Sequence, residues 1–173
     1  MEDNDVVMKV ASKEDVKKIY SLMQKVYNEL EDKTLFVLDP LEYVKTQLTK
    51  EGFGVIACDK EERIVAVFII RYPDLAEDNL GRDIGLKDGQ LKEVVHMESV
   101  VVLPEYRGRG LQLKMLQYAE KLIDTKNYKY FMATVSPDNP ASYQSFEKNG
   151  YKYMVTKEKY HGLVRKIYLK EAI

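Results

Sequence analysis

The stretch from residue 91 to residue 135 constrains the fold more than any other part of the chain. Residues 91–103 and 128–135 have the pattern of strands, and residues 110–124 between them repeat apolar side chains at helical spacing. A strand, a helix and a second strand within about 45 residues form a crossover unit, in which the two strands lie parallel. We therefore predict an α/β fold that contains this parallel pair.

The rest of the sequence adds further strands and helices on both sides of this unit. An apolar run at 6–10 predicts a first strand, and Ser12 followed by Asp15 predicts the start of a helix with one buried stripe. Asp39 as the cap and Pro40 as the first helical residue predict a second helix. The remaining predictions are strands at 54–59, 63–72, 151–157 and 163–169, a helix at 140–149, and an irregular loop at 73–89.

Length and composition predict a single domain over residues 1–173. Leu, Ile, Val and Phe make up more than a quarter of the chain, which is enough for a core, and a chain of this length usually folds as one unit. The 27 basic and 28 acidic residues nearly cancel. The basic footprint of a nucleic-acid-binding protein is therefore missing.

Cysteine and histidine are too few for a disulfide or for a usual zinc site. The chain has one cysteine and two histidines, so no metal is expected. Its first residues are acidic where a signal peptide needs basic ones, and no apolar run is long enough to cross a membrane. We expect a soluble cytoplasmic protein that binds neither membrane nor nucleic acid.

The turn after Pro104 carries the most specific chemistry in the sequence. A predicted strand ends there, Gly108 and Gly110 follow, and a helix begins at once. The start of a helix exposes unpaired N–H groups and a partial positive charge, and glycines let a phosphate approach closely. The segment has neither the Lys and Ser/Thr of a P-loop nor the GxGxxG spacing of dinucleotide folds. It predicts either an anion-binding turn or an ordinary turn whose glycines only ease the geometry.

Two motifs together resemble the GNAT superfamily of acyl-CoA-dependent N-acetyltransferases. The first is Val102-x-Pro104-x-x-Arg107-Gly-x-Gly110, and the second, further along the chain, is Asn139-Pro-Ala-Ser-Tyr-Gln-Ser-Phe-Glu-Lys-Asn-Gly-Tyr. The order of predicted elements is also similar to that of the superfamily over nearly the whole chain. The resemblance implies a mixed, mostly antiparallel sheet with flanking helices, whose central parallel strands splay apart.

The resemblance also implies how coenzyme A is bound. Amides from Gly108 to Leu113 would hold the pyrophosphate, backbone groups of Val100 to Val102 would pair with the pantetheine arm, and Asn139 would contact the coenzyme further along. The residues expected to bind acetyl-CoA are Val100, Val101, Val102, Arg107, Gly108, Arg109, Gly110, Leu111, Gln112, Leu113, Asn139 and Phe146.

Two positions depart from the pattern of the superfamily. Gln112 stands where the motif ends in Gly or Ala, and we expect the helix to point this side chain outward. Phe146 stands where many members carry a tyrosine that protonates the leaving thiolate, and phenylalanine cannot donate a proton. Because the thiolate of coenzyme A is a fair leaving group, this acid is the most dispensable group. Tyr143, one turn earlier, has a hydroxyl, but we expect it to pack in the core.

Glu98 and His96 are the candidates for removing the proton of the amine, with Glu98 ahead. They lie two residues apart on the strand that leads to the turn, so both face the same side. Histidine titrates near neutrality, and the pKa of a carboxyl in an apolar cleft rises. The alternative is that the two side chains pair with each other or with the backbone. The expected donor to the developing oxyanion is the backbone N–H of Val102.

These expectations describe an N-acetyltransferase that moves the acetyl group of acetyl-CoA to a primary amine by direct attack. The acceptor, a small molecule or a peptide, would enter over the first two helices and the loop at 73–89. The acidic residues of that loop, Asp74, Glu77, Asp78 and Asp83, either attract a cationic amine or form solvated surface. The chain is expected to act as a monomer or a homodimer.

Two other functions remain as alternatives. Gln112 and Phe146 together suggest a non-catalytic or regulatory acyl-CoA-binding domain. An RNA-contacting module would use Arg107, Arg109 and Lys114, and the near-zero net charge argues against it.

Overall fold

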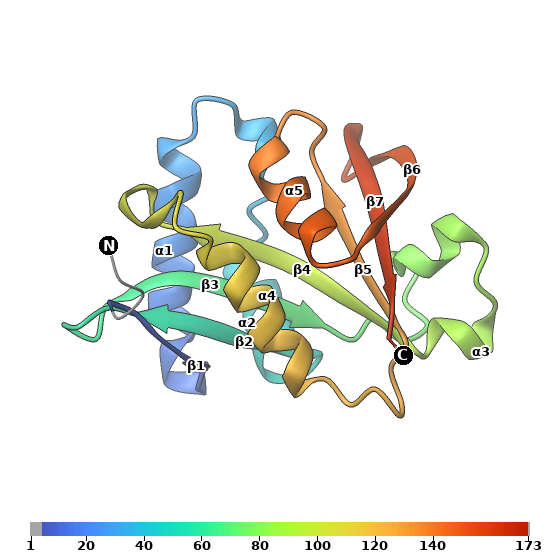
Figure 1. The fold of residues 1–173 in the computed structure, drawn as a ribbon, viewed down its shortest axis with the longest axis horizontal. Coiled ribbons are helices and arrows are strands. Elements are labelled where there is room, and N and C mark those ends of the chain that lie inside the picture. Colours follow the sequence, from blue (N-terminus) through green and yellow to red (C-terminus); the bar gives the residue numbers. More distant parts are fainter. Residues whose placement is uncertain (1–4, 173) are drawn as a thin grey trace.

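The computed structural model describes residues 5–172 and contains a seven-stranded sheet with the order β1-β2-β3-β4-β5-β7-β6 (Figure 1). The strands are β1 (Val7–Val10), β2 (Gly52–Cys58), β3 (Ile64–Arg71), β4 (Val94–Val102), β5 (Tyr130–Val135), β6 (Lys152–Lys159) and β7 (Leu163–Glu171). Neighbouring strands are antiparallel except β4 and β5, which are parallel. The predicted mixed, mostly antiparallel sheet is confirmed.

Helices cover both faces of this sheet. They are α1 (Val16–Glu29), α2 (Leu41–Thr49), α3 (Asp88–Leu91), α4 (Leu111–Leu122) and α5 (Pro140–Lys148), and short 3-10 turns lie at Lys13–Asp15, Lys33–Leu35, Leu80–Ile84 and Pro104–Tyr106. Helices α1 and α2 lie behind the sheet in Figure 1, and α4 and α5 lie in front of it. Among the helices that the structure describes, none combines the length and the apolarity needed to cross a bilayer.

Two apolar layers, one on each face of the sheet, make up most of the core. On one face Phe68 of β3 belongs to the same buried cluster as Met115 of α4. On the other face Val67 belongs to a cluster with Ile19 of α1. Since successive side chains of a strand point to opposite faces, a strand that is covered on both sides is apolar at nearly every position. This explains the continuous apolar runs of β2 and β3.

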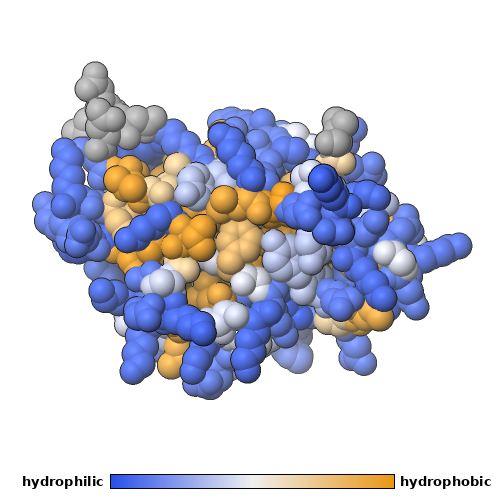
Figure 2. Space-filling model, turned by 90° about the horizontal axis from the view of Figure 1, so that it is seen from below, coloured by the Kyte–Doolittle hydropathy of each residue, from blue (hydrophilic) through white to orange (hydrophobic). Residues whose placement is uncertain are grey.

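The lower end of the molecule in Figure 1 is apolar in its middle and hydrophilic around its rim (Figure 2). Partly buried aromatic residues meet where β2 begins and β3 ends. The ring centroid of Phe53 lies 6.3 Å from that of Tyr72, which in turn lies 4.4 Å from that of Tyr128. All three rings pack against the core layer on the α4 side of the sheet.

The parallel strands β4 and β5 pair over a short length and then separate. Their register covers only the three pairs from Val94 with Tyr130 to His96 with Met132. Beyond His96 the edge of β4 that faces β5 has no strand partner among residues 5–172, so the splay expected from the resemblance is confirmed. The gap lies beside the turn that leads into α4.

Strand β4 also contains a bulge at Glu98. Met97 pairs with Ile70 and Ser99 pairs with Ile69, so Glu98 is an extra residue without a partner on β3. Bulges of this kind redirect side chains and often lie next to active sites. Here the bulge falls where β4 leaves β5, and the side chain of Glu98 is only 14% exposed.

Two local predictions were wrong. Helix α2 starts at Leu41 with Pro40 as its cap, because Pro40 has an extended ψ of 150°, and the side chain of Asp39 makes no capping bond. The segment 73–89 is not irregular throughout, since it contains the turn Leu80–Ile84 and the start of α3. Buried Asn79 organises it by accepting from Gly81 N and donating to the carbonyls of Asp74 and Leu91.

Candidate active site

A cavity of 640 Å³ opens where β4 and β5 separate. Its walls come from the end of α1, the segment 35–39, strands β4 and β5, the first turn of α4, helix α5, the turn between β6 and β7, and Arg165 of β7. Most of the residues predicted to bind acetyl-CoA line it, namely Val100, Val101, Val102, Arg107, Gly108, Gly110, Leu111, Gln112, Asn139 and Phe146. Arg109 and Leu113 are not part of this lining. The Arg109 guanidinium donates to the carbonyl of Glu105 instead.

The turn before α4 has the geometry of an anion-binding site. Gly108 and Gly110 have φ values of 74° and 71°, in the left-handed region that glycine adopts without penalty. A Cβ atom at either glycine would meet nothing within 4 Å, so the space above the turn is open. Because α4 begins at Leu111, the first N–H groups of the helix have no partner within it. Residues 108–113, which we call the phosphate cradle, therefore fit the pyrophosphate of coenzyme A.

The register of β4 decides which peptide groups face the gap. Leu103 N donates to Val65 O, and bonded and non-bonded pairs alternate along an antiparallel ladder. Val101 therefore pairs its backbone groups with β3, whereas the N–H and C=O groups of Val100 and Val102 point away from β3. The backbone groups of Val101, which we expected to pair with the pantetheine arm, are therefore already bonded to β3. The carbonyl of Val102 accepts a bond of 3.0 Å from Arg107 Nε, which leaves the Val102 N–H facing the cavity.

Gln112 does not point outward as expected. Its Nε2 lies 3.0 Å from the hydroxyl of Ser142, which is buried in the first turn of α5. This direction follows from the packing of the first turns of α4 and α5 side by side. Asn139 caps α5 through Oδ1, which accepts from Ser142 N. The amide of Gln112 thus ties the two helix starts together at the wall of the cavity.

Phe146 borders the cavity as a packed ring. It is buried, and it meets Tyr151 edge-on at 5.1 Å and Phe68 at 6.5 Å between centroids. Tyr143 does not line the cavity, and the Nζ of Lys166 lies over its ring at 3.9 Å. The expected packing role of Tyr143 agrees with its contact with the core. Neither residue offers a proton inside the cavity.

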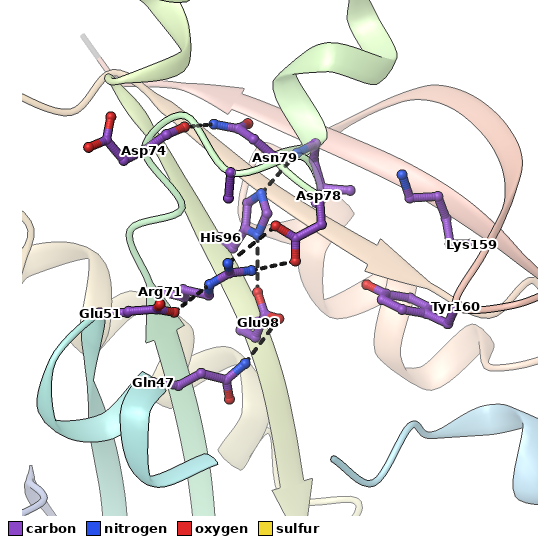
Figure 3. Close-up of polar contacts among 12 residues, drawn as sticks. Gln47, Glu51, Arg71, Asp74, Asp78, Asn79, His96, Glu98, Lys159 and Tyr160 are labelled. Atoms are coloured by element: carbon purple, nitrogen blue, oxygen red, sulfur yellow. Dashed lines mark hydrogen bonds and ion pairs between the residues drawn. The ribbon is translucent and has the colours of Figure 1, made fainter. Parts of the chain in front are cut away.

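His96 and Glu98 form a fixed pair (Figure 3). The backbone N–H of Leu80 donates to His96 Nε2 at 3.0 Å, so in the neutral ring the proton sits on Nδ1. That proton is donated to Glu98 Oε2 at 3.1 Å, and Gln47 Nε2 donates to the other oxygen, Oε1, at 3.3 Å. His96 is buried with both ring nitrogens engaged, while Glu98 lines the cavity. Of the two candidates, only Glu98 is therefore placed to meet a bound molecule.

Ion pairs hold the segment 73–89 against the sheet. Arg71, which is buried at the end of β3, donates to both carboxylate oxygens of Asp78, at 2.7 and 3.2 Å, and to Glu51 at 3.1 Å. Asp83 pairs with Lys159 at 2.7 Å. Of the acidic residues considered above as attracting an amine, Asp78 and Asp83 are thus committed to partners within the protein.

Sequence reasoning missed three polar residues that line the cavity. They are Asp39, Tyr160 and Arg165. The hydroxyl of Tyr160 bonds to Thr134 Oγ1 at 2.9 Å and points toward Glu98 (Figure 3). Burial of this hydroxyl, with the charge of Glu98, raises the pKa of Tyr160 to about 12. Tyr160 is held there by a left-handed φ of 49°, unusual for a bulky residue.

Arg165 lies on β7 and is only 4% exposed. One signal in the sequence points to it, since Arg165 alternates with the buried residues Ile167 and Leu169 and so shares their side of the strand. Asp39 had been assigned to the start of a helix, and Tyr160 had no assigned role. The structure brings all three together from segments that lie far apart in the sequence.

Replacing Asp39 with Asn is expected to stabilise the fold at neutral pH by about 2 kcal/mol. Burial and the charge of Glu98 raise the pKa of the Asp39 carboxyl from 3.8 to about 6. At pH values well below the unfolded pKa of 3.8 both folded and unfolded chains keep this proton, and as the pH rises from 3.8 toward 6 the unfolded chain loses it first, so native stability falls. Urea unfolding of both proteins at about pH 4 and pH 8 measures the effect. If the free energy of unfolding of Asp39→Asn exceeded that of the wild type by no more at pH 8 than at pH 4, the prediction would be contradicted.

Comparison with known proteins agrees with this geometry. Residues 16–151 match the Acetyltransferase (GNAT) family. No curated protein matches the chain in sequence. Solved structures share the fold at low identity. An acetyltransferase of the GNAT family from Streptococcus pneumoniae is 15% identical, with a TM-score of 0.73, and the match covers 96% of this chain and 99% of that chain.

Two further solved structures contain bound molecules. The aminoglycoside acetyltransferase AAC(6')-Ib, in complex with coenzyme A and kanamycin, is 15% identical with a TM-score of 0.68, over 96% of this chain and 94% of that chain. NAA60 of Arabidopsis thaliana, in complex with a bisubstrate analogue, is 10% identical with a TM-score of 0.75, over 96% of this chain and 97% of that chain. These likenesses establish the fold.

Proposed function

Because the chain belongs to the GNAT family of acetyltransferases, we propose that it transfers the acetyl group of acetyl-CoA to a primary amine by direct attack. One observation carries this proposal. A single cavity is lined by Glu98, by Val102 and by the start of the phosphate cradle, and these groups follow one another along the chain from β4 into α4. These are the groups that bind the coenzyme, activate the amine and stabilise the charge that develops on the carbonyl oxygen.

In the coenzyme half of the cavity, backbone N–H and C=O groups would make most of the contacts to coenzyme A. The N–H groups of the cradle would bind the pyrophosphate, since a helix start carries unpaired donors and a partial positive charge. The free N–H and C=O groups of Val100 would pair with the pantetheine arm as a strand does. This arrangement would bring the thioester carbonyl beside Val102.

The amine half supplies the base. The carboxylate of Glu98 would take a proton from the bound ammonium, directly or through a water molecule. The neutral amine then attacks the thioester carbon, its oxygen accepts a hydrogen bond from Val102 N–H, the C–S bond breaks, and the thiolate leaves. His96 and Gln47 each hold one oxygen of Glu98, so the lone pairs left to it are aimed in a fixed direction. Their role is to position the base.

Two measurements on the full chain test this function together. Calorimetric titration with acetyl-CoA measures binding, and a thiol-release assay over a panel of primary amines measures turnover. We expect binding and thiol release that depends on the amine. Binding without amine-dependent release would favour the acyl-CoA-binding domain instead, and the absence of binding would contradict both functions.

A further inference from the structure

Arg165 is a feature of the cavity that acetyl transfer to a simple amine does not use. Its guanidinium donates to two carbonyls, Val164 O through Nη1 and Thr34 O through Nη2. A guanidinium carries five N–H bonds, so these two carbonyls do not exhaust its capacity. Within residues 5–172 it forms no ion pair with a carboxylate. The exposed carboxylate of Asp32 acts on it from beyond ion-pair distance, and burial, the larger influence, lowers the pKa of Arg165.

A buried cation without a carboxylate partner is costly to a fold, because the lost hydration is not returned by an opposite charge. Arg71 shows the usual solution in the same protein, since two carboxylates surround it. Arg165 is equally buried but faces the cavity. Its position is therefore suited to bind an anionic group of a molecule that occupies the cavity.

Carboxylates and this guanidinium line the same cavity. Glu98, Asp39 and Arg165 all belong to its lining, and the charges of all three act on the hydroxyl of Tyr160. The guanidinium of Arg165 lies 6.0 Å from the centroid of the Tyr160 ring. The acceptor side of the cavity thus presents two carboxylates and one cation, which complements a molecule that carries both an ammonium and an anion.

A carboxylate fits this site better than a phosphate does. One guanidinium presents a forked edge that matches a carboxylate, whereas a doubly charged phosphate would be repelled about twice as strongly by the carboxylates of Asp39 and Glu98 in the same cavity. The neighbouring wall is apolar and includes Leu35, Phe36 and Val37. The body of the molecule between its charged groups would therefore be apolar as well.

We infer that the acceptor is an aminocarboxylate with an apolar body, such as an amino acid, and that Arg165 binds its carboxylate; this inference rests on the acetyl transfer proposed above. Glu98 takes one proton from the ammonium and later releases it to solvent, and the C–N bond forms as the C–S bond breaks. The second proton lost from the nitrogen goes to the leaving thiolate, so the products are an N-acetylated aminocarboxylate, the coenzyme A thiol, one proton in solvent and the regenerated carboxylate of Glu98. The carboxylate of the acceptor stays ionised throughout and takes no part in the bond changes.

Matched pairs of amines test the inference in the thiol-release assay. L-phenylalanine and phenethylamine differ only in the carboxylate, as do 6-aminohexanoate and hexylamine to within one methylene group. We expect the wild-type protein to prefer the carboxylate member of at least one pair by about tenfold or more in kcat/KM. In Arg165→Gln this ratio is expected to fall to near one. The ratio compares two substrates in one preparation, so a partly folded variant does not distort it.

A binding measurement separates this inference from the proposed reaction. 3-Phenylpropanoate has the carboxylate and the apolar body but no amine, so its binding to the protein saturated with coenzyme A requires no chemistry. We expect calorimetry to detect it for the wild type, more weakly for Arg165→Lys, which keeps the charge without the fork, and not for Arg165→Gln. Binding without any turnover would support the carboxylate site while contradicting acetyl transfer. Equal use of both members of each pair, or a preference that survives in Arg165→Gln, would overturn the inference.

Discussion

Replacing Gly110 with valine is expected to weaken the binding of coenzyme A by roughly a hundredfold, the effect of losing two or more charge-assisted hydrogen bonds. Gly110 has a φ of 71°, and the space where its Cβ would lie is open, so a branched side chain would enter the phosphate cradle. It would keep the pyrophosphate away from the N–H groups at the start of α4. Calorimetric titration with coenzyme A measures the loss.

Gly85 provides a matched control for this substitution. Its φ is 78°, a Cβ there would also meet nothing within 4 Å, and it does not line the cavity. Gly85→Val therefore imposes a similar backbone cost, about 1 to 2 kcal/mol, without touching the cradle. We expect its affinity for coenzyme A to equal that of the wild type. Equal losses in both variants, or wild-type binding by Gly110→Val, would contradict the cradle. Alanine at the same two positions repeats the comparison at lower strain.

Replacing Glu98 with Gln is expected to lower kcat by about a hundredfold to a thousandfold and to leave the binding of coenzyme A unchanged. Glutamine has nearly the same shape but cannot accept a proton from an ammonium. The remaining rate is expected to rise with pH, because only amine that is already deprotonated in solution would react. Thiol release at saturating acetyl-CoA, followed across a range of pH, measures both effects.

Glu51→Gln is the control for the Glu98 substitution. Glu51 belongs to the same polar region, where it accepts from Arg71 at 3.1 Å, but it does not line the cavity. Its replacement removes one carboxylate of this polar region, a more exposed one at 40%, without removing the base. We expect its kcat to stay within about threefold of the wild type, as is usual for a partly exposed ion pair. Full activity of Glu98→Gln, or an equal loss in both variants, would rule out the role of Glu98.

Local patterns were enough to predict most of the fold. The longer helices have strong apolar periodicity, strands such as β2 and β3 are continuous apolar runs, and the glycines before α4 have the positive φ values that such a turn requires. The segment 73–89, which was misjudged, is fixed by single polar groups. Asn79 orders a segment that has no periodicity, through bonds to residues as far away as Leu91. No window of a few residues contains such a bond.

The two halves of the candidate site differed in how well they could be predicted. The coenzyme half is one continuous stretch, from Val100 to Leu113, with Asn139 and Phe146 added by the resemblance, so a motif describes it. The acceptor half consists of single side chains such as Asp39 and Arg165, which are more than a hundred residues apart and meet only in the folded protein. The direction of the Gln112 side chain likewise depends on how two helices pack together.

Because of the bulge in β4, the residue proposed as the base is not one of the residues whose pairing holds the sheet together. Among residues 5–172, Glu98 has no partner in the ladders with β3 or β5, although it lies in the middle of the central strand. A different side chain at this position would leave the pairing of the flanking residues intact. The strand pairing itself therefore sets no limit on the residue at this position. What limits the choice is the need for an acceptor for the buried N–H of His96 and the buried amide of Gln47, so a replacement that supplies one would change the proposed base while it keeps the architecture.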